Sequence, residues 1–203
     1  MYGKWMKDSV KVERWTGELG MFVTGVMRHG SMAVCKKEIN RRVEEKGKEE
    51  WLRGMSEKST LEWYRRKDQP RYERFYDGGY GGDLLFRART KSLEVNSRMY
   101  RWKNDGSKVC EMCVTGVDET VEHLMLECER YEYARTQMLE VVVGEVGVEE
   151  WREMRDRRVE MEYLLGLCAE CRSDSRVIES VKEFLENSWR ARRREHERQG
   201  APQ

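Results

Sequence analysis

The chain has 203 residues and a formal net charge of +1, and hydrophobic and charged residues each make up 38% of it. A hydrophobic share below the usual ~45–50% is typical of disorder, but seven tryptophans and nine tyrosines exclude a disordered chain. The balanced charge excludes a protein that is basic overall, and no apolar run reaches the ~18 residues that span a bilayer. We therefore expect a folded, lightly cored protein with no membrane segment.

The N-terminal sequence MYGKWMKDSVKVERW lacks the apolar core of a signal peptide. We expect an intracellular protein, in the nucleus or the cytoplasm. In that reducing environment the six cysteines are expected to be thiols or metal ligands and not disulfides.

Only two prolines occur, and Glu, Lys, Arg, Leu and Met are frequent, which favours helices throughout. The predicted fold class is mainly α, an irregular helical domain held together by one structural zinc site. In chain order the sequence predicts an N-terminal segment of uncertain role (1–50), a helical region with a glycine-rich loop (51–100), a zinc-binding CCHC module (101–145) and C-terminal helices with a basic end (146–203).

Three amphipathic helices are predicted after the glycine-rich loop YDGGYGGD, which ends in a candidate N-cap, Asp83. Their apolar positions recur at spacings of three and four. The first helix has Leu85, Ala88, Ser92, Val95 and Met99; the second has Tyr131, Ala134, Met138 and Val141; and the third, after the caps Asp174 and Ser175, has Ile178, Val181, Leu185 and Trp189.

A cluster of three cysteines and a histidine lies within nineteen residues, CEMCVTGVDETVEHLMLEC, at the spacing C-x2-C-x9-H-x4-C. Zinc prefers four such ligands in a tetrahedron, and a two-residue gap lets both thiolates of one turn face the same ion. The sequence predicts one zinc ion bound by Cys110, Cys113, His123 and Cys128. Four protein ligands leave no open position for water, so the predicted site is structural and not catalytic.

The second half of the motif constrains the backbone. Asp118 or Thr120 could cap a short helix that carries His123. Five residues on an ideal α-helix turn by ~500°, which would leave His123 and Cys128 ~140° apart. We therefore expect the helix to loosen near Cys128. The alternative is a set of scattered thiols and a solvated histidine that bind no metal.

A second C-x2-C pair, Cys168 and Cys171, has no cysteine after it and only His196 downstream. Cys168 falls on an apolar helix face. We interpret the pair as a buried thiol beside an exposed one, outside the zinc site, and Cys35 as an isolated thiol.

No catalytic constellation stands out in the sequence. It contains no G-x-x-x-x-G-K-[ST], no H-E-x-x-H, no G-x-S-x-G and no Tyr-x-Asp-Asp polymerase pair. Acid–base catalysis would depend on His29, His196 or carboxylates, and no acidic pair stands apart from the charged surfaces. We therefore expect a protein that is not an enzyme.

The cluster and its surroundings resemble the C-terminal zinc-knuckle-like region of arthropod non-LTR retrotransposon reverse transcriptases. In that family Cys-x2-Cys is followed by Glu-Thr, Glu-His-Leu, Glu-Cys, an aromatic residue and an arginine. The matching positions here are Cys110, Cys113, Glu119, Thr120, Glu122, His123, Leu124, Glu127, Cys128, Tyr131 and Arg135. Upstream, Arg87, Arg89 and Thr90 match the family's Arg-Thr helix. The resemblance spans about residues 50–195, but Glu129 replaces the usual proline and the polymerase palm is absent.

The resemblance implies RNA or single-stranded DNA as a partner, and a reverse transcriptase polypeptide as a second one. Local sequence adds a basic C-terminal end beside Trp189, and arginine suits phosphate contact. The candidate nucleic-acid contacts are Arg190, Arg192, Arg193 and Arg194, and a second basic stripe of Arg87, Lys91 and Arg98. Because the C-terminal arginines lie far in sequence from every zinc ligand, we expect their replacement to leave the zinc content unchanged.

Each basic stripe could instead be a solvated helix face. The alternative function is a zinc-held helical module that docks on a protein partner and binds no nucleic acid. Salt-sensitive RNA binding would separate the two functions, because phosphate contacts release counterions steeply.

Overall fold

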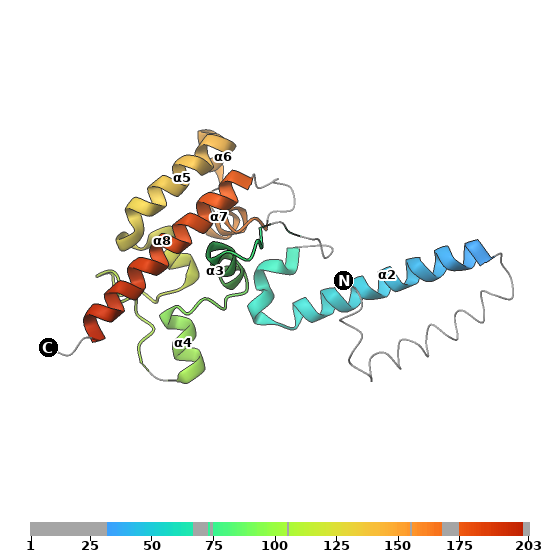
Figure 1. Ribbon diagram of the computed structural model, residues 1–203, viewed down its shortest axis with the longest axis horizontal. Helices are drawn as coiled ribbons and strands as arrows, with labels where there is room; N and C mark the ends of the chain where they lie inside the picture. The colour runs from blue at the N-terminus through green and yellow to red at the C-terminus, as the bar shows by residue number, and fades with distance from the viewer. Residues whose placement is uncertain are drawn as a thin grey trace. The chain divides into compact units, whose positions relative to one another are not determined.

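The computed structural model describes residues 32–66, 73, 75–104, 106–154, 156–167 and 175–200 (Figure 1). The chain divides into two compact units, Met1–Arg53 and Gly54–Gln203. The described part is mainly α-helical and contains no β-strand, only an isolated antiparallel bridge between Val109 and Asp118. The predicted mainly α fold class is therefore confirmed.

The elements of the described part comprise α-helices, two short 3₁₀-helices and a single π-helical turn. They are α2 (Met32–Ser56), the 3₁₀-helix η2 (Ser59–Arg66), α3 (Tyr80–Arg89), α4 (Asn96–Lys103), the π-turn η3 (His123–Glu127), the 3₁₀-helix η4 (Glu129–Tyr131), α5 (Glu132–Val146), α6 (Val148–Glu153), α7 (Arg157–Leu164) and α8 (Ser175–Gly200).

In the first unit, α2 carries charged residues on most of its surface. Arg41 pairs with Glu38 one turn before it and with Glu45 one turn after it; Arg41 and Glu45 are exposed, and Glu38 is partly exposed. Pairs of this kind, exposed to water and screened by salt, stabilise a helix only slightly. α2 continues through Gly47 and Gly54 without a break, and local charge pairing supports the helix.

In the second unit, α8 is the helix against which α3, α5 and α7 pack (Figure 1). Its apolar stripe is almost completely buried, with at most 2% of each residue exposed: Val177, Ile178, Val181, Phe184 and Leu185. Met138 and Val142 of α5 and Leu84, Leu85 and Ala88 of α3 belong to the same core. The apolar stripe predicted near the C-terminus is therefore confirmed.

The sequence predicted a loop for the whole glycine-rich segment, but part of the segment is helical. α3 begins at Tyr80, and Gly81 and Gly82 are buried in its first turn. A Cβ atom on Gly81 would lie 2.8 Å from the Cβ of Lys182 on α8. Glycine at this position therefore allows α3 and α8 to approach closely, and the helix starts before the predicted cap, Asp83.

The prediction of one continuous amphipathic helix through Leu85 and Met99 is wrong, because the segment forms two helices, α3 and α4. The backbone N–H groups of Ser92 and Leu93 both donate to the carbonyl of Arg87, and Lys91 has a left-handed φ of 49°. Leu93 and Val95 are buried in the connection. Their burial explains why the apolar spacing continues through residues that are not helical.

The break also separates the predicted basic stripe. Arg87 lies on α3, Lys91 lies in the connection, and Arg98 lies on α4. These three residues therefore do not share one helix face.

Candidate metal centre

The two cysteines of the C-x2-C pair lie in a hairpin formed by residues 108–119. Cys110 N–H donates to the carbonyl of Val117, and Glu119 N–H donates to the carbonyl of Lys108, each at 2.8 Å. Gly116 reverses the chain with a φ of +68°, a conformation that glycine adopts without strain. The hairpin thus returns the chain toward the segment that carries His123.

His123 and Cys128 are brought together by a π-helical turn. The Thr120 hydroxyl accepts a hydrogen bond from His123 N–H at 3.0 Å, so Thr120 caps this segment as the sequence predicted. Cys128 N–H donates to the carbonyl of His123 at 2.8 Å, a bond between residues five apart. Five-residue bonding brings residue 128 back above residue 123, and the predicted loosening near Cys128 is confirmed.

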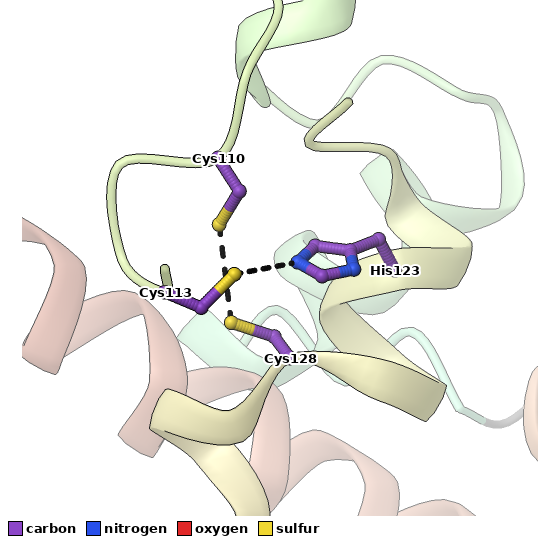
Figure 2. A group of neighbouring side chains, drawn as sticks. All are labelled: Cys110, Cys113, His123 and Cys128. Atoms are coloured by element: carbon purple, nitrogen blue, oxygen red, sulfur yellow. Dashed lines mark hydrogen bonds between the residues drawn. The ribbon is translucent and has the colours of Figure 1, made fainter. Parts of the chain in front are cut away.

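The sulfur atoms of Cys110, Cys113 and Cys128 and a ring nitrogen of His123 all lie within 4.8 Å of one another (Figure 2). The sulfurs of Cys110 and Cys128 are 3.9 Å apart, and that of Cys113 is 3.4 Å from Nε2 of His123. Metal–sulfur bonds of ~2.3 Å and metal–nitrogen bonds of ~2.0 Å in a tetrahedron require about 3.8 and 3.6 Å. These two distances are close to tetrahedral values, and the cluster could hold one metal ion.

Backbone amides prepare the three sulfurs for the thiolate form. The N–H groups of Met112, Thr115 and Arg130 donate to Cys110, Cys113 and Cys128 respectively, each two residues further along the chain. Hydrogen bonds of this kind stabilise negative charge on sulfur. They are directed at the atoms that would face the ion.

Burial and hydrogen bonding act differently on the three thiols in the metal-free protein. Burial raises the pKa of Cys110 to about 12, and it also raises the pKa of Cys128. At Cys113 burial is opposed by hydrogen bonds with Thr115 and His123, and the pKa of Cys113 is lowered to about 7. Two thiols thus remain protonated at neutral pH until a cation replaces their protons.

Glu127 fixes the orientation of the histidine ring. His123 Nδ1 lies 3.3 Å from a carboxylate oxygen of Glu127, while Nε2 faces Cys113. Nδ1 donating to a carboxylate leaves Nε2 deprotonated and available to an ion, as in other carboxylate–histidine–metal arrangements. Glu127 is itself paired with Arg157, which holds the carboxylate in place.

Arg135 supplies positive charge on the inner side of the cluster. Its Nη2 donates to the carbonyl of Cys128 at 3.0 Å, and the residue is only 9% exposed. Burial lowers the pKa of Arg135, and a thiolate at Cys128 would oppose that shift. Three thiolates and one divalent cation would carry a net charge of −1, which the guanidinium beside Cys128 offsets.

A buried ion pair joins α8 to the base of the hairpin. Arg192 donates to both carboxylate oxygens of Glu119, at 3.2 and 2.7 Å, and to the side chain of Asn96 at 2.8 Å. Glu119 is 1% exposed and Arg192 is 6% exposed. Glu119 also accepts the backbone N–H of Asn96, the first residue of α4. One carboxylate therefore links the hairpin, α4 and α8.

The candidate nucleic-acid residues lie in different environments. Arg190, Arg193 and Arg194 are exposed on α8, whereas Arg192 is committed to Glu119. Arg87 pairs with Asp83, and Lys91 pairs with Glu62. Arg98 lies over the ring of Trp102, with 5.4 Å from its guanidinium carbon to the ring centroid.

Sequence reasoning did not assign a role to two supporting residues at the metal cluster. Thr115 donates to Cys113 from two positions further on, and Glu127 follows His123 by one helical turn. An acidic residue at that offset from a histidine ligand is the signal that could have found Glu127. Cys168, Cys171 and His29 lie outside the described residues, as does the side chain of Cys35.

Comparison of the chain with protein-family models, with curated proteins and with solved structures gives no match. Among the helices that the structure describes, none combines the length and the apolar character that crossing a membrane requires.

Proposed function

We propose that the chain is a zinc-binding module in which a structural zinc ion fixes a small helical domain. The observation that carries this proposal is the convergence of three thiols and one imidazole in a largely buried, four-ligand group. Zinc takes this donor set in a tetrahedron, and a complete set of four protein ligands leaves no position for substrate or water. Zinc supplies a cross-link here and no reaction, and we propose no enzymatic activity.

Metal analysis and cobalt substitution test the identity of the ion. Purified protein should contain one zinc per chain, and the Co²⁺-substituted protein should show the intense visible absorption of tetrahedral thiolate coordination. Cys113→Ser should lose both, whereas Cys35→Ser, which changes a cysteine outside the cluster, should keep both. Native protein without metal, or a Cys113→Ser variant with full metal content, would contradict the proposal.

We further propose that the module binds RNA or single-stranded DNA, as a C-terminal portion of a non-LTR retrotransposon reverse transcriptase that lacks the polymerase palm. The resemblance of the sequence around the cluster supports this function, with a reverse transcriptase polypeptide as a second partner. The exposure of Arg190, Arg193 and Arg194 on one end of α8 also supports it, because arginine binds phosphate through two parallel hydrogen bonds.

Salt dependence of RNA binding tests this part. Each phosphate neutralised on a single strand contributes ~0.7 to the slope of log affinity against log salt. Arg193→Ala/Arg194→Ala should therefore flatten the slope by about 1.4. The matched control, Arg152→Ala/Arg176→Ala, removes two exposed cations elsewhere and should leave the slope unchanged.

A second candidate function is docking on a protein partner. Tyr133 and Val114 are 78% and 95% exposed, and apolar side chains left in water are typical of interaction surfaces. If the protein does not bind an unstructured RNA even at low salt, this second function is favoured.

A further inference from the structure

The surface around α4 differs from the other charged surfaces of the protein. The helix sequence NSRMYRWK contains no acidic residue, and Lys108 follows it in the hairpin. We define the α4 patch as Arg98, Arg101, Trp102, Lys103 and Lys108. All of these residues except Arg98 are exposed, and Arg98 is partly exposed.

The cations of the α4 patch differ from the arginines of α8 in their partners. Among the residues that the structure describes, none of the four cations of the patch forms an ion pair; Arg98 and Lys108 lie instead over aromatic rings. On α8, by contrast, Arg190 pairs with Glu186 at 2.7 Å and Arg198 pairs with Glu195 at 3.7 Å. The α4 patch therefore retains more of its positive charge for a ligand than the arginine-rich C-terminal end does.

A hollow of about 290 Å³ lies beside α4. The charged residues of its lining are four cations and two carboxylates, namely Lys91, Arg98, Arg101, Lys108, Asp118 and Glu122. Lys91 is already paired, with Glu62 at 2.7 Å and with Glu122 at 3.9 Å. The unpaired charge that remains is carried by Arg98, Arg101 and Lys108 against Asp118, and it favours an anion.

Aromatic rings alternate with these cations. Trp102 is 78% exposed, and its ring lies 5.4 Å from the guanidinium carbon of Arg98. The amine of Lys108 lies 4.8 Å from the centroid of Tyr100. An exposed aromatic face beside unpaired cations is the arrangement with which proteins bind single-stranded nucleic acid, because bases stack on the ring while phosphates contact the cations.

The anion would not be held by the N-terminus of α4. Glu119 already accepts the N–H of Asn96 through its carboxylate and the N–H of Ser97 through its carbonyl. Attraction for phosphate must therefore come from the side chains of the α4 patch.

We propose that the α4 patch is the protein's main contact site for single-stranded RNA or DNA. This inference rests on the nucleic-acid binding proposed above. A phosphate lies between Arg98, Arg101 and Lys108 in the hollow, and a base stacks on Trp102. The hairpin that carries two of the metal ligands also holds Lys108 beside α4, since Asn96 Nδ2 donates to the carbonyl of Val109 at 2.8 Å. Metal binding and nucleic-acid binding therefore share one piece of backbone.

The experiment uses the zinc-loaded full chain and a fluorescent uridine homopolymer of about ten nucleotides, a length within the usual site size. Anisotropy titrations over a series of salt concentrations give affinity and slope. Arg98→Ala/Arg101→Ala/Lys108→Ala should flatten the slope by about two. The matched control removes three other exposed cations, Arg65→Ala/Arg152→Ala/Arg176→Ala, and should leave the slope unchanged.

Trp102 is tested separately, against an aromatic residue of equal exposure. Trp102→Ala should weaken binding by about 5- to 150-fold, the range for loss of one stacked base, with little change in slope. Trp102→Phe should retain most of the affinity. Tyr133→Ala, which removes a ring that is also 78% exposed, should have no effect. On the unaltered chain, photo-crosslinking to a thiouridine oligonucleotide should label Trp102 or its neighbours on α4.

The outcomes separate this inference from the proposed function. If the unaltered chain binds RNA with a steep salt dependence while the α4 variants behave like their controls and crosslinks fall elsewhere, the α4 patch is not the site and nucleic-acid binding stands. If the unaltered chain shows no salt-dependent binding to the oligonucleotide, both proposals are overturned. If an acidic peptide binds as well as RNA and Trp102→Ala has no effect, the patch serves a protein partner and the inference is wrong.

Discussion

Three consecutive arginines of α8 have three different environments. Arg192 is buried against Glu119, Arg193 lies over the ring of Tyr80, and Arg194 is exposed. One residue turns an α-helix by ~100°, so neighbours in sequence face different surroundings. The sequence shows that arginines are concentrated near the end of this helix, but it could not show which arginine points inward. Arg192 is far in sequence from the proposed metal ligands, yet it contacts Glu119, which lies between two of them.

Arg192→Ala should destabilise the protein by about 3–5 kcal/mol, because Glu119 would remain buried without its partner. It should also weaken metal binding, since Glu119 anchors the base of the hairpin that carries Cys110 and Cys113. Urea unfolding and competition with a chromogenic chelator measure the two effects. Arg194→Ala should change the free energy of unfolding by no more than about 0.5 kcal/mol. Equal effects of the two variants would show that the buried pair has no special role.

Glu127→Ala should lower the metal affinity by about 10- to 100-fold, because the His123 ring would lose the partner that fixes its orientation. Glu129→Ala, which removes an exposed carboxylate next to Cys128, serves as the control. Arg157→Ala removes the ion pair with Glu127 and so measures how much that pair contributes to the metal affinity. Metal competition titrations on the three variants give the comparison. If Glu127→Ala binds the metal with unchanged affinity, Glu127 does not support the metal centre.

At the scale of elements, ligand spacing predicted more than apolar spacing did. The gap of five residues between His123 and Cys128 required a departure from the α-helix, and the π-turn provides it. The apolar positions from Leu85 to Met99 suggested continuous helix, yet the chain leaves the helix at Thr90. No glycine marks that end; Lys91 adopts the left-handed conformation instead, and its residue type gave no signal.

Gly81→Val should destabilise the protein by about 1–3 kcal/mol, because added carbon atoms would meet Lys182 and force α3 away from α8. Gly144→Ala is the contrasting variant: Gly144 is exposed in α5 with no atom within 4 Å of an added Cβ. That change should stabilise the protein by up to about 1 kcal/mol through helix propensity. Thermal and urea unfolding of both variants test the close approach of α3 and α8. If Gly81→Val is as stable as the unaltered protein, the approach is not tight.

Across the whole molecule, charged residues form part of the core. Arg89 is completely buried; it donates to the carbonyl of Leu165 at 2.6 Å and to the hydroxyl of Tyr76 at 2.7 Å, and it pairs with Glu73. Composition correctly indicated a helical protein with few apolar residues. It could not indicate that a buried arginine also connects these segments, because its partner Leu165 is far away in sequence.

Removal of the metal should destabilise the second unit as a whole. The 108–119 hairpin has one β-bridge, so an ion bound by the cluster would supply the cross-link that holds it. The binding energy of a structural zinc is folding energy. A strong chelator should lower the melting temperature and the helical circular dichroism signal, and added zinc should restore both. Cys128→Ser should show no response to either reagent. A melting curve that is the same with and without chelator would contradict a structural role for the ion.

The position of α8 determines the order in which the protein can fold during synthesis. Lys182 and Arg192 contact Asp77 and Asn96, about a hundred residues earlier, so the core cannot close until the ribosome has made α8. The metal ligands, in contrast, all lie between Cys110 and Cys128 and can bind an ion while the chain is still growing. A metal-loaded hairpin would then present Glu119 to the emerging helix. Zinc supply during translation would thus determine how much of the newly made chain reaches the folded state.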